Sequence, residues 1–101
     1  MVQFILAALA GVALGAFIVV VILKWKDIIS WFRNRTKLKE SDKQNIAFTL
    51  QERLKNGKYK TVQGIFNKRT NEILDGQKIK SEQVDAKIAK VHDGEELVIY
   101  D

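Results

Sequence analysis

Few side chains in this sequence could carry out chemistry, and they lie near its carboxyl end. His92 is the only histidine and there is no cysteine, which excludes disulfides, thiolate zinc sites and cysteine nucleophiles. Asp93, Glu95 and Glu96 could approach a hard cation, but their spacing lacks the ligand pattern of a calcium loop. We therefore expect no enzymatic activity, no catalytic residue, no metal site and no cofactor. His92 is expected to end a helix, where the helix dipole favours an imidazolium.

The element that would position the rest of the chain is residues 2–23, VQFILAALAGVALGAFIVVVIL, which contain no charged side chain. As a helix this stretch would be about 33 Å long, enough to cross a hydrocarbon core of about 30 Å. The sequence thus predicts a transmembrane helix. The alternative is a cleaved secretory signal, which typically has a basic residue before the apolar run and small residues after it. Here Lys24-Trp25-Lys26 follows instead.

Charge sets the predicted orientation of this helix. Lys24, Lys26, Arg33 and Arg35 follow the apolar stretch closely, whereas no charged side chain precedes it. The positive-inside rule then predicts a single-pass membrane protein with its N-terminus outside and its C-terminal domain in the cytoplasm.

A ridge of small residues, Ala7, Gly11 and Gly15, recurs every four residues along the predicted span. Such a ridge lets two helices approach closely, so these three are the candidate helix-packing residues. The alternative is that glycine and alanine are simply common in spanning helices. The span also lacks the ionisable groups that ion pathways and proton relays need, which favours an anchor or an assembly surface.

Residues 24–41 are predicted to form a basic, aromatic juxtamembrane helix and a hinge. Apolar side chains recur on one helical stripe, and tryptophan suits the headgroup layer. Nearby basic side chains would attract anionic lipids. The candidate membrane-interface residues are Lys24, Trp25, Lys26, Ile28, Ile29, Trp31, Phe32, Arg33 and Arg35.

Residues 42–101 are predicted to form a small α+β domain with the order α-β-β-α-β and a three-stranded sheet. A helix over 42–56 follows a capping-box pattern, S-x-x-Q at 41–44. Strands are expected at 59–66, 72–79 and 97–100, with a helix between the last two and the third strand beside the first. The predicted core is Ile46, Leu50, Leu54, Val62, Phe66, Leu74, Ile79, Val84, Ile88, Val91, Leu97 and Ile99.

These features lead to a functional hypothesis. The protein is expected to be a non-catalytic, single-pass accessory, assembly or docking subunit of a larger membrane protein complex. Its expected partners are the bilayer, including anionic lipids, and other membrane subunits or further copies of itself. Nucleic acid is not expected as a partner, because the basic half of the chain would lie next to the membrane. The alternative is a self-assembling, membrane-perturbing protein of the holin-like or toxin-like kind.

Overall fold

The fold is known from a computed structural model, which describes residues 1–100. Helices and strands alternate irregularly along this part of the chain. In order they are α1 (Val2–Ala10), β1 (Ile18–Leu23), α2 (Trp25–Arg33), α3 (Thr36–Glu40), β2 (Asn45–Arg53), β3 (Tyr59–Asn67), β4 (Glu72–Val84), α4 (Ala86–Val91) and β5 (Leu97–Tyr100).

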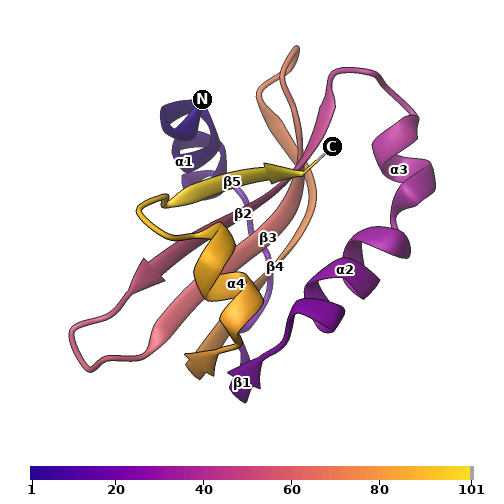
Figure 1. Cartoon of the computed structure of the whole chain (residues 1–101). Coiled ribbons are helices and arrows are strands. Elements are labelled where there is room, and N and C mark those ends of the chain that lie inside the picture. Colours follow the sequence, from indigo (N-terminus) through magenta and orange to yellow (C-terminus); the bar gives the residue numbers. More distant parts are fainter. Residues whose placement is uncertain (101) are drawn as a thin grey trace.

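The five strands form one mixed sheet in the order β1-β4-β3-β2-β5 (Figure 1). β2, β3 and β4 make an antiparallel meander. β1 runs parallel to the last part of β4, and β5 pairs antiparallel with β2. Because β1 and β2 lie in one sheet but are not neighbours, the chain crosses over between them, and α2 and α3 form that crossover. β1 and β5 are the two edges of the sheet.

One face of the sheet is apolar and is covered by α1. Every second residue of β2 contributes to it, namely Ile46, Phe48 and Leu50, together with Val62 and Phe66 of β3. Ile5 of α1 is fully buried among these side chains. No side chain caps the N-terminus of α1, so packing on this face is what holds the helix in place.

The opposite face of the sheet is unusually polar and is covered by α2, α3 and α4. Thr49, Thr61, Gln63 and Ser81 are all buried there. The Nε2 of Gln63 donates a 2.7 Å hydrogen bond to the Ile28 carbonyl of α2, and its Oε1 accepts from Gln77. Buried amides cost little when both ends are bonded, so Gln63 ties α2 to the centre of the sheet.

Apolar contacts complete the attachment of the helices to this polar face. They form two small clusters on either side of Gln63. One joins Leu23, Ile28, Ile79 and Ile88, and the other joins Trp31, Ala47 and Ile65. The molecule therefore has two separate apolar layers, one on each face of its sheet.

The predicted transmembrane helix over residues 2–23 is wrong. α1 ends at Ala10, Gly11 and the following residues continue without regular structure, and Ile18–Leu23 form a strand. Gly15 adopts φ +81°, a left-handed conformation that interrupts a helix. The run of β-branched residues in IVVVIL then follows its intrinsic preference for a pleated strand.

Among residues 1–100 no helix combines the length and the apolar character needed to cross a membrane. The prediction of a single-pass membrane protein, with an outside N-terminus and a cytoplasmic domain, is corrected accordingly. The molecule measures 36 × 26 × 25 Å, with residues 2–23 packed into the same globule as the rest of the described chain.

The predicted helix over 42–56 and the predicted three-stranded sheet are also wrong, because Asn45–Arg53 form a central strand. Ile46 and Leu50 lie four residues apart, a spacing that fits one helical face and one strand face equally well. The capping-box signal is in fact a turn, in which Asp42 Oδ1 accepts from the Gln44 amide before β2 begins. As a result β5 pairs with β2 and not with the strand at 59–66.

Several expected elements are confirmed in position. Strands occupy 59–67 and 97–100, and the strand expected at 72–79 extends to Val84. The helix expected after Ser81 begins later, at Ala86. Half of the predicted core is buried, whereas Leu74 and Ile99 are exposed. The omissions are Ile5, Leu23, Ile28, Trp31, Ala47, Phe48 and Ile65, most of which lie in segments assigned to the membrane, to its interface or to a helix.

Candidate functional site

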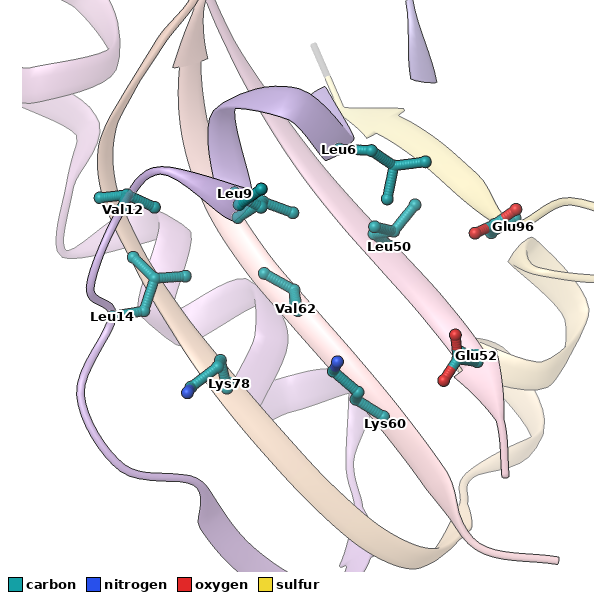
Figure 2. Close-up of a pocket in the computed structure, with 11 residues that line it drawn as sticks. Leu6, Leu9, Val12, Leu14, Leu50, Glu52, Lys60, Val62, Lys78 and Glu96 are labelled. Carbon is teal, nitrogen blue, oxygen red and sulfur yellow. The ribbon is translucent and has the colours of Figure 1, made fainter. Parts of the chain in front are cut away.

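A cavity of about 300 Å³ lies between α1, the segment that follows it, and the apolar face of the sheet (Figure 2). Its apolar wall is built from both sides. The leucines and valines that line it are Leu6, Leu9, Val12 and Leu14 from the N-terminal segment and Leu50 and Val62 from β2 and β3. The cavity exists because α1 is too short to cover the whole face, and its one fully buried side chain, Ile5, lies over the hydrophobic cluster beside it.

Charged side chains line this cavity on two sides. Lys60 and Lys78 reach it from β3 and β4, and Glu52 and Glu96 reach it from β2 and the turn before β5 (Figure 2). In Figure 2, Lys78 lies on the side of Leu14, while the two carboxylates lie on the far side of Leu50. The cavity thus has an apolar body and a mouth of mixed charge.

Three lysines gather around one aromatic ring next to this mouth. The Nζ atoms of Lys60, Lys78 and Lys80 lie 5.8, 4.6 and 4.4 Å from the centroid of the Phe17 ring. Lys60 and Lys80 are directly opposite each other on β3 and β4. A like-charge pair in that position destabilises a sheet, and the ring of Phe17 offsets part of this repulsion.

These three lysines form no ion pair with a carboxylate in the described part of the chain. Within residues 1–100 the ion pairs are Arg35–Asp75 and Arg69–Asp42, each with an N···O distance of 2.7 Å. Both of these pairs are structural: Arg35 also lies 3.7 Å over the Trp31 ring, and Asp42 accepts from Asn67. The lysine group, defined here as Lys60, Lys78 and Lys80, therefore has no ion-pair partner, although Glu52 is the cross-strand neighbour of Lys60.

The free edge of β1 is a second notable surface. β1 pairs only with β4, so the backbone groups on its other side have no strand partner in the described part of the chain. Val19 and Val21 are 76% and 63% exposed. Exposed apolar edge strands are rare in proteins that remain alone, because they readily pair with another chain.

His92 lies in a buried hydrogen-bonded chain on the polar face. Its Nδ1 is 2.9 Å from the Glu95 carbonyl, and its Nε2 is 2.7 Å from Thr49 Oγ1, which is 2.7 Å from the Tyr100 hydroxyl. A carbonyl only accepts, so Nδ1 of His92 carries the proton in this bond. For a neutral ring, Nε2 then accepts from Thr49, and Thr49 accepts from Tyr100.

Burial changes the titration of two groups in this chain. Desolvation lowers the pKa of His92, although the hydrogen bond to Glu95 opposes the change. Desolvation raises the pKa of Tyr100, and the hydrogen bond to Thr49 opposes that change in turn. Both shifts favour the neutral form. His92 does follow the end of a helix as predicted, but burial lowers its pKa, whereas the expected dipole effect would have favoured the imidazolium.

The acidic residues Asp93, Glu95 and Glu96 are exposed in the turn before β5. No group of three or more histidine or carboxylate side chains among residues 1–100 is arranged to hold a metal ion. The three carboxylates instead lie around the end of α4, and Glu95 contributes its backbone carbonyl to His92.

The candidate helix-packing residues do not share one helix. Ala7 is on α1, Gly11 follows its last residue, and Gly15 lies in the irregular segment with a positive φ. Ala7, Gly11 and Gly15 are all exposed.

Seven of the nine candidate membrane-interface residues lie on α2, which packs on the sheet; Lys24 precedes the helix and Arg35 follows it. Ile28 and Trp31 are buried there, while Trp25 and Phe32 lie 5.9 and 5.1 Å from the Tyr100 ring. The remaining side chains are exposed or half-buried: Lys24, Lys26 and Arg33 are exposed, and Ile29 and Arg35 are half-buried.

Sequence reasoning missed the cavity and the lysine group. The alternation at Lys78 and Lys80 was a signal that both lysines lie on one face of a strand. Their proximity to Lys60 depends on the pairing of β3 with β4, and the role of Phe17 depends on the end of α1 being at residue 10. Comparisons with protein families, with curated proteins and with solved structures find no match to this chain.

Proposed function

We propose that this protein is a non-catalytic docking subunit of a larger protein assembly, and that it binds its partner along the free edge of β1. The partner contributes an apolar extended segment flanked by acidic residues, which adds a strand to the sheet. The observation that carries this proposal is the exposure of Val19 and Val21 on an edge strand with no charged residue.

Strand addition fits the properties of β1. The unpaired backbone groups supply hydrogen bonds along the edge, while alternate side chains supply specificity. Ile18 and Ile22 are also exposed, at 46% and 42%. Burial of this apolar surface against a partner removes it from water and stabilises the complex.

Charge favours an acidic partner over a second copy. Lys24 and Lys26 follow β1, and Lys80 lies directly beside Val19 on β4. Two copies paired edge to edge would bring these lysines together in a protein whose net charge is already +5. Acidic residues flanking the partner strand would instead be attracted to them and would speed association.

Site-directed photo-crosslinking in cells tests the proposal. A photoreactive residue replaces Val21 in the full chain, and a matched control replaces Lys55, an exposed residue in the β2–β3 connection. We expect one dominant adduct from position 21 and none from position 55. Mapping of the adduct should locate it in an apolar segment of another protein with acidic flanks.

Two further measurements make the result decisive. Val19→Glu should abolish the adduct from position 21, because a carboxylate on the apolar edge repels the acidic flanks of the partner, and it should leave the melting temperature nearly unchanged, because Val19 is exposed and lies beside Lys80. Raising the salt concentration should slow formation of the complex. Equal adducts at positions 21 and 55 would contradict the proposal. An adduct formed only with a second copy of the chain would replace it with the self-assembling alternative, which otherwise stays a prediction.

A further inference from the structure

We propose that the cavity beneath α1 is a binding site for a single-chain amphiphile with an anionic headgroup. The alkyl chain would occupy the apolar body of the cavity, and the headgroup would lie at Lys78 and the neighbouring lysines. The cavity itself contains no residue of β1, although Lys80, one of the neighbouring lysines, also lies beside Val19 on the β1 edge. Binding of the amphiphile does not depend on a protein partner.

The apolar body of the cavity suits an alkyl chain. Leu9 and Leu14 face Val62 across it, and Leu6 and Val12 lie at its outer rim (Figure 2). Leu6 is 45% exposed, so a chain entering the cavity would remove this side chain from water as well as its own methylenes. Each buried methylene contributes favourably to binding.

The size of the cavity sets the class of ligand. At about 300 Å³ it lies at the lower end of the range for ligand pockets, which is about 300–1,000 Å³. One alkyl chain of medium length fits this volume, whereas the two chains of a membrane phospholipid do not. The ligand is therefore a free monomeric amphiphile.

The mouth of the cavity selects an anion. Lys78 lines the cavity, and Lys80 lies two residues further along the same face of β4. Both lack a carboxylate partner within residues 1–100. An anionic headgroup between them would relieve the repulsion within the lysine group and form charge-assisted hydrogen bonds.

The two glutamates at the mouth do not cancel this preference. Glu52 is the cross-strand partner of Lys60, so its charge acts mainly on that lysine. Glu96 lies beyond Leu50, on the side away from Lys78 (Figure 2). Lys78 consequently has the least compensated charge of the residues that line the cavity, and it is the expected headgroup ligand.

Isothermal titration of the full chain with decyl phosphate and with decanoate, both kept monomeric, tests the proposal. We expect saturable binding with one molecule per chain. Decyltrimethylammonium, which has the same alkyl chain and a cationic head, should bind at least about tenfold more weakly, as loss of a charge-assisted contact implies.

Variants locate the site. Lys78→Gln should weaken binding of decyl phosphate about tenfold, and Lys37→Gln, an exposed lysine on α3, is the matched control with unchanged affinity. Leu6→Glu should weaken binding by placing a second carboxylate next to Glu96, beside the alkyl chain (Figure 2). The 45% exposure of Leu6 makes this change tolerable to the fold. Circular dichroism should confirm that each variant is folded. Val21→Lys, which alters the β1 edge, should bind the amphiphile with unchanged affinity.

Four outcomes would overturn the proposal. The first two are equal affinity for the anionic and cationic amphiphiles and no saturable binding of either anion. The third is an unchanged affinity in both Lys78→Gln and Leu6→Glu. The fourth is binding to vesicles of anionic phospholipid without binding of monomeric decyl phosphate. The last result would assign the lysine group to a lipid surface instead of a cavity ligand.

Discussion

The hydroxyl of Thr49 lies 2.7 Å from Nε2 of His92 and thereby joins the middle of β2 to the end of α4. Both side chains are buried. Tyr100 extends this contact to the last strand, because its hydroxyl is 2.7 Å from the same Thr49 oxygen. A single threonine thus connects three elements of the polar face.

This contact makes stability dependent on pH. The pKa of His92 is lowered in the folded state, so the unfolded chain binds more protons as the pH falls below the ordinary histidine value of about 6.5. The contribution of the neutral ring is fully present above that pH and is lost as the pH falls towards the lowered folded-state pKa. Thermal melting at a series of pH values should therefore show a declining midpoint below about 6.5.

His92→Asn is the control for this prediction. An asparagine amide can still donate to the Glu95 carbonyl but does not titrate. The variant should lose the decline in the histidine range and keep any decline at lower pH. Asp42, whose pKa is lowered from 3.8 to about 2 chiefly by hydrogen bonds from the Gln44 backbone and the Arg69 side chain, titrates in that separate, more acidic range. An identical pH profile for both proteins would contradict the assignment to His92.

Thr49→Val should destabilise the protein. Valine has nearly the same shape but leaves His92 Nε2 and the Tyr100 hydroxyl without a partner in a buried site, which costs about 1–3 kcal/mol. Urea denaturation measures the loss as a lower midpoint with an unchanged slope. Tyr100→Phe, which removes only the end of the chain of hydrogen bonds, should cost less; a cost as large as that of Thr49→Val would show that Thr49 is not the central member.

Asp85 should contribute more to stability than its position at one helix start suggests. Its Oδ1 accepts a 3.0 Å hydrogen bond from the Ile88 amide of α4, and its Oδ2 accepts a 2.6 Å bond from the Trp25 amide at the start of α2. Asp85→Ala removes both acceptors, and loss of a capping side chain alone costs about 0.5–2 kcal/mol.

The control for Asp85 is Asp27→Ala, also in a first helical turn but exposed. Only a favourable interaction with the helix dipole is lost there, so the change in the free energy of unfolding should be smaller. Hydrogen exchange at the first amides of α2 should also accelerate in Asp85→Ala. Unchanged exchange in α2 would show that the bond to Trp25 does not hold that helix.

Gly64→Ala should be destabilising because there is no room for a methyl group at the centre of β3. A Cβ at Gly64 would lie 2.9 Å from the Asp75 carbonyl oxygen and 3.0 Å from the Phe48 ring. Overpacking of this kind costs about 1–3 kcal/mol. Gly11→Ala is the matched control, since its nearest neighbour, the Ala8 carbonyl oxygen, is 3.9 Å away. Similar midpoints for the two variants in urea would argue against the close approach of Phe48.

The C-terminal half of the fold was readable from sequence because its signals are local. Tyr59–Asn67 is rich in β-formers, the turn after it is polar, and Gly94 with φ +71° ends the stretch after α4. The number and spacing of the acidic residues near His92 predict no metal site there, and this expectation stays a prediction that metal-binding experiments can check.

The prediction for the N-terminal half was wrong because it rested on the uncharged composition of residues 2–23 and not on their backbone conformation. An uncharged stretch of membrane-spanning length predicts a helix in lipid, but the same residues contain Gly15 in a left-handed conformation and a β-branched run that pairs with Ile79–Val84. That pairing involves residues far apart in sequence, and no local pattern reveals it. The cavity was missed for a similar reason, since its walls come from residues far apart in the sequence, from Leu6 to Glu96.

The parallel pairing of β1 with the end of β4 also has a consequence for biosynthesis. The Trp25 amide beside β1 donates to Asp85, which is synthesised 60 residues later in the chain. At about 5–20 residues per second, a ribosome would take roughly 3–12 s to deliver that stretch. During this interval the apolar N-terminal segment of the nascent chain cannot pair with β4. Chaperones that bind such segments should therefore determine the yield of folded protein.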